Sequence, residues 1–226
     1  MKLSFRYLIA FLLLSVLVQE AHEIAHQLIN GLFQVCSGTR YFLYWEMCDA
    51  DSKIDFTILA LVGPFVNFLL FTIGYYLLRN AGTSIQKSYG FSIIMAANPL
   101  QRLQAIVFRG SDEIAAFKKI FGPVEPIKGI AVLAGLALTL LFVIPALYRA
   151  FKLSKNKNAI LVFLSCLLLS YAVTLLLQKA FLQTGIKTSL LQPSGLAGFS
   201  WLVWMDIVLV LLFIPLAKNL KRLIGS

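Results

Sequence analysis

The chain contains two histidines, and both fall within one short motif, His22-Glu23-Ile24-Ala25-His26. On a helix, residues four apart lie on one face, so both imidazoles can bind a single metal ion. Zinc lowers the pKa of a bound water molecule from about 15.7 to about 7, which supplies hydroxide at neutral pH. Glu23 projects close to that face and can take a proton from this water and pass it to a leaving amine. The motif therefore predicts metal-assisted hydrolysis, with Glu23 as the catalytic base.

The segment that carries the motif is otherwise suited to a membrane interior. Glu20, Glu23 and the two histidines nevertheless fall within seven positions of it, and Gln19 and Asn30 share their face at one-turn steps. Each ionisable group inside a membrane helix costs about 2.5–3.5 kcal/mol on insertion scales, and such groups usually mark function. A lone histidine is more often a structural group satisfied by a hydrogen bond, but a pair at this spacing favours a metal site.

A hydrolytic zinc site needs a third protein ligand and an open position for water. No third histidine exists, so we expect a carboxylate. Position along the predicted helices favours Asp112 as the third ligand, and Asp206 is a rival that enters its helix from the same side. Asp112 can alternatively serve only as the cap of a short helix. The full set of candidates is Glu46, Asp49, Asp51, Asp55, Asp112, Glu113, Glu125 and Asp206.

The composition is that of a membrane protein. Of the 226 residues, 59% are hydrophobic and 13% are charged, whereas a soluble domain is about half apolar and a quarter charged. Several apolar runs are long enough to cross a hydrocarbon core of about 30 Å. We predict an all-α polytopic membrane protein with about six transmembrane helices, at residues 5–32, 56–78, 89–108, 127–150, 158–180 and 199–217.

Two shorter elements are predicted between these spans. Residues 34–55 are too polar to cross a membrane, and the aromatic run 39–45 favours a short β-hairpin. Residues 110–126 begin with a helix-start pattern and continue with apolar residues at helical spacing. We expect a short amphipathic helix there, lying at the membrane surface. Cys36 and Cys48 flank the hairpin loop and can form a disulfide in an oxidising compartment or remain free thiols.

The formal net charge of +10 does not indicate nucleic-acid binding. The lysines and arginines are spread over the ends of apolar runs, where membrane helices keep cations close to phosphate headgroups. We therefore expect the lipid bilayer as a partner, and no nucleic acid. If the spans alternate, the N-terminal side carries eleven of the twenty Lys and Arg residues and the motif side nine, which favours a cytoplasmic N-terminus.

With these residues in hand, residues 5–125 resemble the site-2 protease family of intramembrane zinc peptidases, in its divergent, peptidase-like branch. The resemblance rests on the His22–His26 motif, on the hairpin-like segment after it, and on Gly63-Pro64-Phe65-Val66-Asn67, which is similar to a Gly-Pro-x-x-Asn motif of the family. Asn98-Pro99 followed by an aspartate is similar to the family's third motif. Here, however, Asp112 comes fourteen positions after Asn98 instead of closely behind it.

The resemblance implies a zinc-dependent metalloprotease that cleaves peptide bonds in or near membrane-spanning segments, with a single-span membrane protein as substrate. It implies Zn²⁺ held by His22, His26 and Asp112, and Asn98 as a residue that supports the site or holds substrate. Asn67, from the second motif, and Arg102, which shares a helical face with Asn98, are expected in the same surroundings. The hairpin would present the substrate as an added strand. Residues 1–125 would form the metalloprotease core, and residues 126–226 would add three transmembrane helices.

Other functions fit the same residues. A catalytically inactive relative, a metal-binding scaffold or a transporter also uses a buried polar cluster among membrane helices. We expect a multi-pass protein of the plasma (inner) membrane. The resemblance places the motif side in the cytoplasm, which is the opposite of the orientation that the lysine and arginine distribution favours. The oligomeric state and the identity of the substrate are not specified by the sequence.

Overall fold

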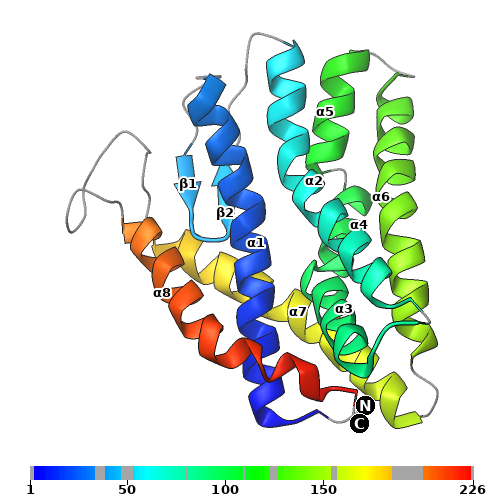
Figure 1. Ribbon diagram of the computed structural model, residues 1–226. Coiled ribbons are helices and arrows are strands. Elements are labelled where there is room, and N and C mark those ends of the chain that lie inside the picture. The colour runs from blue at the N-terminus through cyan, green and yellow to red at the C-terminus, as the bar shows by residue number, and fades with distance from the viewer. Residues whose placement is uncertain are drawn as a thin grey trace.

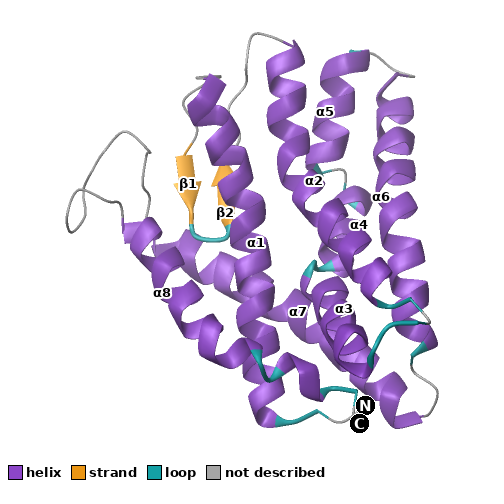
Figure 2. Ribbon diagram, viewed as in Figure 1, coloured by secondary structure: helices purple, strands orange, loops and turns teal. Residues whose placement is uncertain are grey.

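Figure 1 shows a computed structural model of the chain, in which long helices stand side by side and a pair of short strands lies beside the first of them. The structure describes residues 3–33, 39–46, 53–79, 81–108, 110–122, 127–153, 157–184 and 201–224. Within these ranges nearly all regular structure is helical, as the colouring of Figure 2 shows.

In the described part of the chain, four helices are long and apolar enough to cross a membrane, which supports a multi-pass integral membrane protein. The helix α8 (Trp201–Ala217) is also apolar but has only 17 residues. Of the six predicted spans, the sixth begins at 199–200, outside the described residues, and the third is broken, as described below. The four long helices are α1 (Phe5–Phe33), α2 (Lys53–Leu77), α6 (Ile127–Lys152) and α7 (Lys157–Thr184).

The predicted third span, 89–108, is two helices, α3 (Ser84–Ala96) and α4 (Pro99–Val107). The break falls at Asn98, which has a left-handed φ of 57°. Pro99 follows at the first position of α4, where its missing N–H costs nothing and its ring disfavours helical backbone at the preceding residue. The prediction of one continuous span is therefore wrong, and the asparagine–proline pair is the cause.

Two strands of three residues each, β1 (Thr39–Tyr41) and β2 (Tyr44–Glu46), pair antiparallel where the sequence predicts a short hairpin. The turn between them packs against α1. Leu43 in this turn has a left-handed φ of 60°, and its backbone N–H donates to the Glu20 carboxylate of α1. Phe42 and Leu43 are buried in a cluster with Val16 of α1. Glu20 thus fastens the hairpin to the helix that carries the histidines.

Glu20→Ala is expected to destabilise the protein by about 1–3 kcal/mol, because it leaves the buried N–H of Leu43 without an acceptor. Thermal unfolding of the detergent-purified protein measures this effect. Glu20→Gln is the matched control, since its amide oxygen can still accept this hydrogen bond. Equal stability of the alanine and glutamine variants would contradict the role of Glu20.

The helix predicted in 110–126 is present as α5 (Asp112–Phe121), but it does not lie across the end of the bundle. It runs beside α2 and α6 (Figure 1) and packs against both. Gly135 of α6 allows this close approach, since a Cβ there would meet Ile114 Cγ1 at 3.0 Å. Burial of Ile114 and Ala116 explains why an amphipathic pattern formed a packed helix here instead of a surface helix.

The helices after residue 126 share one core with those before it. The helix α6 packs on α2 and α5, whereas α7 and α8 pack on α1. One cluster of buried side chains joins Phe11, Phe71 and Phe91 to Val143 and Cys166. Both ends of the chain lie at the same end of the bundle in Figure 1, where a short 3-10 helix, η2 (Leu220–Arg222), packs on α3. The division into residues 1–125 and 126–226 stays a prediction from the resemblance.

Candidate metal centre

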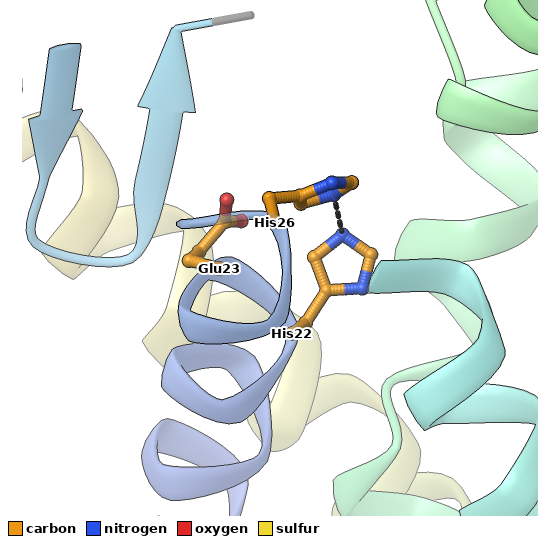
Figure 3. A group of neighbouring side chains, drawn as sticks. All are labelled: His22, Glu23 and His26. Atoms are coloured by element: carbon orange, nitrogen blue, oxygen red, sulfur yellow. Dashed lines mark hydrogen bonds between the residues drawn. The ribbon is translucent and has the colours of Figure 1, made fainter. Parts of the chain in front are cut away.

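The two histidines lie on the buried side of α1 that faces α2 (Figure 3). Their Nε2 atoms are 3.3 Å apart, and the rings meet edge to face. The four-residue spacing on a regular helix produces this approach, as the sequence predicts. With Glu23, these side chains form a buried group whose ligand atoms all lie within 4.8 Å of one another, which can hold a metal ion.

Asp112 reaches the same two imidazoles from the first residue of α5. Its Oδ2 atom lies 3.2 Å from His22 Nε2 and 3.7 Å from His26 Nε2. The helix is capped instead by Ser111, whose hydroxyl accepts from the backbone N–H of Ile114 at 3.3 Å. Asp112 therefore does not cap the N-terminus of α5, and its carboxylate contacts the two histidines.

With a proton on each Nδ1 atom, both Nε2 atoms carry a lone pair that can bind a metal ion, and the neighbours of the two Nδ1 atoms are compatible with this assignment. His26 Nδ1 lies 2.7 Å from Leu59 O, a carbonyl that can only accept, so the ring proton is on Nδ1. Arg102 Nη2, which can only donate, lies 3.3 Å from His22 Nε2. His22 Nδ1 is 3.4 Å from the amide of Asn67, whose buried Oδ1 has no hydrogen-bond partner among the described residues. Flipping this amide lets Oδ1 accept from Nδ1–H and satisfies both groups.

The three acceptor atoms fit a tetrahedral zinc site. Zinc bonds of about 2.0–2.1 Å at tetrahedral angles place neighbouring ligand atoms about 3.3–3.4 Å apart. The separations found for His22, His26 and Asp112 are 3.2, 3.3 and 3.7 Å. Two nitrogen lone pairs and a carboxylate oxygen this close repel one another unless a cation lies beside them, and either a metal ion or the Arg102 guanidinium, which contacts His22 and Asp112, can supply this charge. The residues present therefore fit the ion that the motif predicts.

Gly63 of α2 makes room for the two imidazoles. A Cβ at this position would collide with His26 Nε2 and would lie 2.7 Å from His22 Nε2. Only a residue without a side chain allows α2 to pass this close to the ligand atoms. The glycine of the Gly63-Pro64 pair, which the sequence singles out by resemblance, thus has a direct steric role at the site.

Glu23 lies beside the ligands with its carboxylate on the side of the hairpin (Figure 3). It is buried, and its Oε1 atom accepts from Gln19 Nε2 at 2.8 Å, one helical turn earlier. This bond fixes the orientation of the carboxylate. The proximity to the imidazoles and the fixed orientation suit the role of general base that the sequence predicts for Glu23.

Arg102 is closer to the ligands than the sequence suggests. Its guanidinium lies 3.4 Å from Asp112 Oδ2 and 3.6 Å from Glu113 Oε1, in addition to its contact with His22. Both carboxylates are acceptors for this buried cation, and Thr139 also donates to Glu113. Arg102 thus contacts the proposed ligand side chains directly, so a metal ion bound there would lie close to its positive charge.

These residues open onto a polar cavity of about 430 Å³. It is lined by α1, β2, α4, α5 and α7, and it contains the side chains of Tyr44, Gln101, Lys118 and Gln178 as well as the metal-site residues. A cavity of this size and polarity has room for water beside the histidines. The sequence analysis missed Gln178, although a glutamine in the apolar helix α7 is a signal of the same kind as Glu20 in α1.

Asn98 does not touch the histidines. Its amide donates to Gln101 Oε1 and Thr174 Oγ1, both at 2.6 Å, so it links the helix break to α7. Through Gln101 it supports the cavity wall. Of the other candidate carboxylates, Asp55 lies in the first turn of α2 and Asp206 lies in α8. The side chains of Glu46, Asp49, Asp51, Glu125, Cys36 and Cys48 lie outside the described part of the chain.

No protein-family model, no curated protein and no solved structure matches this chain. The fold and the site therefore rest on the residues themselves: a helical membrane protein with four candidate spans and a buried His22-Glu23-His26 group.

Proposed function

We propose that this protein is a zinc-dependent intramembrane endopeptidase, which hydrolyses peptide bonds in or near the membrane-spanning segments of protein substrates. The observation that carries the proposal is the convergence of three acceptor atoms, from His22, His26 and Asp112, within 3.2–3.7 Å of one another. They come from helices ninety residues apart in the chain and lie beside the Glu23 carboxylate in a water-accessible cavity.

In this proposal His22, His26 and Asp112 would hold the zinc, which would supply a Lewis acid for the substrate carbonyl and lower the pKa of the attacking water. Glu23 accepts the proton of the attacking water and delivers it to the amide nitrogen of the leaving chain. Gln19 keeps the Glu23 carboxylate in place for both transfers. Arg102 lines the cavity, and its charge, held in place by Asp112 and Glu113, would stabilise negative charge that develops on the substrate carbonyl oxygen.

The surroundings favour a substrate from the membrane. The site lies in a helix suited to a membrane interior, and residues such as Gln101 and Gln178 keep the cavity polar. Tyr44, in the strand β2, lines the same cavity, so a substrate segment that extends along this strand would reach Glu23. We propose a single-span protein of the plasma (inner) membrane as substrate, in line with the resemblance to site-2 proteases.

Removal of zinc is the direct functional test. The purified protein, reconstituted in vesicles with a single-span substrate, is expected to cleave it, to lose this activity after dialysis against a chelator, and to regain it on addition of zinc. The products are identified by mass spectrometry, which also locates the cut. Cleavage that persists unchanged in the chelated protein would overturn the proposal.

One observation favours a second candidate, a membrane scaffold that is not hydrolytic. Arg102 already contacts His22, Asp112 and Glu113, and its charge can neutralise the cluster without a metal ion. In a scaffold of this kind, Arg102→Gln would destabilise the fold, and neither the wild type nor the variant would cleave a substrate. In the protease, the same variant keeps zinc and loses cleavage, because the ligands remain and only the charge stabilisation of the carbonyl oxygen is lost.

A further inference from the structure

A second polar pocket lies at the opposite end of the bundle from the histidines, between the last turns of α2 and α6 and the start of α3. We propose that it binds the headgroup of an anionic phospholipid. The pocket has a volume of about 530 Å³ and three cationic side chains, Lys87, Arg149 and Lys152. None of the described residues that line it carries a carboxyl group. Its full lining is Tyr75, Leu78, Lys87, Pro145, Tyr148, Arg149, Lys152 and Leu153.

Aromatic rings hold two of these cations in place. The Arg149 guanidinium lies 4.1 Å from the centre of the Tyr75 ring, and its Nη1 atom donates to the Tyr75 carbonyl at 3.2 Å. The Lys152 ammonium lies 4.6 Å from the centre of the Tyr148 ring. Tyrosine together with Lys or Arg is the combination that membrane helices place at the level of the lipid headgroups. The positive charge is thus presented at a fixed site, at the depth where phosphates lie.

No acidic side chain lies in the described lining of this pocket. Of the Asp and Glu residues whose side chains the structure describes, Glu20, Glu23, Asp55, Asp112, Glu113 and Asp206, none contributes to it. The segments that join helices at the pocket end, 78–83, 153–156 and 218–226, contain no Asp or Glu. An anion that enters the pocket therefore meets Arg149 and Lys152 with no carboxyl group in the described lining.

The pocket continues into an apolar groove between α2 and α6. Tyr75 and Pro145 line both the pocket and a cavity of about 300 Å³ that also contains Phe71 and Leu141. Thr72 and Phe142 join this cavity to a further one of about 290 Å³, whose lining reaches Leu61. The part of the groove near Leu61 is almost entirely apolar, and exposed side chains such as Phe65 and Leu69 form its outer rim.

The length of the basic pocket and the groove together matches one phospholipid molecule. From Tyr75 to Leu61 the groove follows α2 for about 21 Å, at 1.5 Å per residue. One leaflet of the hydrocarbon core is about 15 Å thick, half of the whole. A phosphate in the basic pocket therefore leaves room for its acyl chain along the groove. A free phosphate ion would use the cations but not the groove, which is why we assign the site to a lipid.

Native mass spectrometry of the full-length protein tests the assignment. The protein is released from detergent after incubation with phosphatidylglycerol or with phosphatidylcholine of the same acyl chains. We expect retention of one phosphatidylglycerol and much weaker retention of phosphatidylcholine. Arg149→Gln combined with Lys152→Gln is expected to weaken phosphatidylglycerol binding about 30-fold, at roughly fivefold for each cation. The single variant Lys152→Gln changes an exposed residue, leaves folding intact and should show the smaller, roughly fivefold effect.

Lys157→Gln combined with Lys218→Gln is the matched control, because it removes two exposed cations from the same end of the bundle but outside the pocket. It should retain the lipid like the wild type. Equal losses in the control and in the pocket variants would show a diffuse charge effect and overturn the proposal. Displacement of the lipid by millimolar inorganic phosphate would also overturn it, since the site would then recognise an anion alone.

Discussion

Glu23→Gln is expected to lower the rate of substrate cleavage by at least about a hundredfold while about one zinc per chain stays bound. Glutamine keeps the size of the side chain, and its carbonyl oxygen can still accept from Gln19. It cannot take a proton from water, so proton transfer to the leaving amine is lost. Because the proposed ligands are the neighbouring histidines and Asp112, the metal content should not change. Cleavage rates in vesicles and elemental analysis of the same preparation measure both quantities.

Glu20→Gln is the control for this experiment. It makes the same chemical change to a buried carboxylate on the same helix, but Glu20 contacts the hairpin turn at Leu43 and not the imidazoles. It should keep most of the activity. A Glu23→Gln variant that cleaves as fast as the wild type would exclude Glu23 as the base, whatever the metal content.

Gly63→Ala is expected to remove zinc binding and to destabilise the fold by about 1–3 kcal/mol, the usual cost of overpacking. The added methyl group would occupy the space of the His22 and His26 rings, at 2.7 Å from His22 Nε2. Either α2 moves away or the imidazoles turn, and both changes separate the ligand atoms. Zinc content and the thermal unfolding temperature of the purified protein measure the two effects.

Gly129→Ala serves as the matched control, since Gly129 lies in the helix α6 and a Cβ there meets nothing within 4 Å. This variant should bind zinc normally and be slightly more stable, because alanine favours helical backbone over glycine. If Gly63→Ala also behaved in this way, the close approach of α2 to the histidines would be refuted.

The approach of the two histidines can be predicted from the sequence because it follows from helix periodicity. The His22–His26 pair needs only the regular helix α1, and the absence of a third histidine pointed to a carboxylate. Asp112 was favoured by counting spans, and the structure does bring it to both imidazoles. Its distance from Asn98 along the chain is explained by the helix α4 and the turn after it, which return the chain to α1.

Features that depend on tertiary packing were not predictable in the same way. The apolar run 89–108 has the composition of a single span, and only the left-handed backbone at Asn98 divides it. The amphipathic pattern of α5 is the same for a helix on a membrane and for one that packs between α2 and α6. The packed position depends on Gly135, which lies far along the chain and leaves room for Ile114 of α5. The contacts of Arg102 with three metal-site neighbours likewise come from helices that meet only in the folded protein.

Zinc content is the most direct test of the proposed metal centre. Elemental analysis of the detergent-purified wild type, after incubation with zinc and removal of the excess, should give about one zinc per chain. Asp206→Ala should give the same value, whereas His22→Ala and Asp112→Ala should lose most of the metal. A wild type without zinc, or an Asp112→Ala variant that retains a full equivalent, would contradict the site described above.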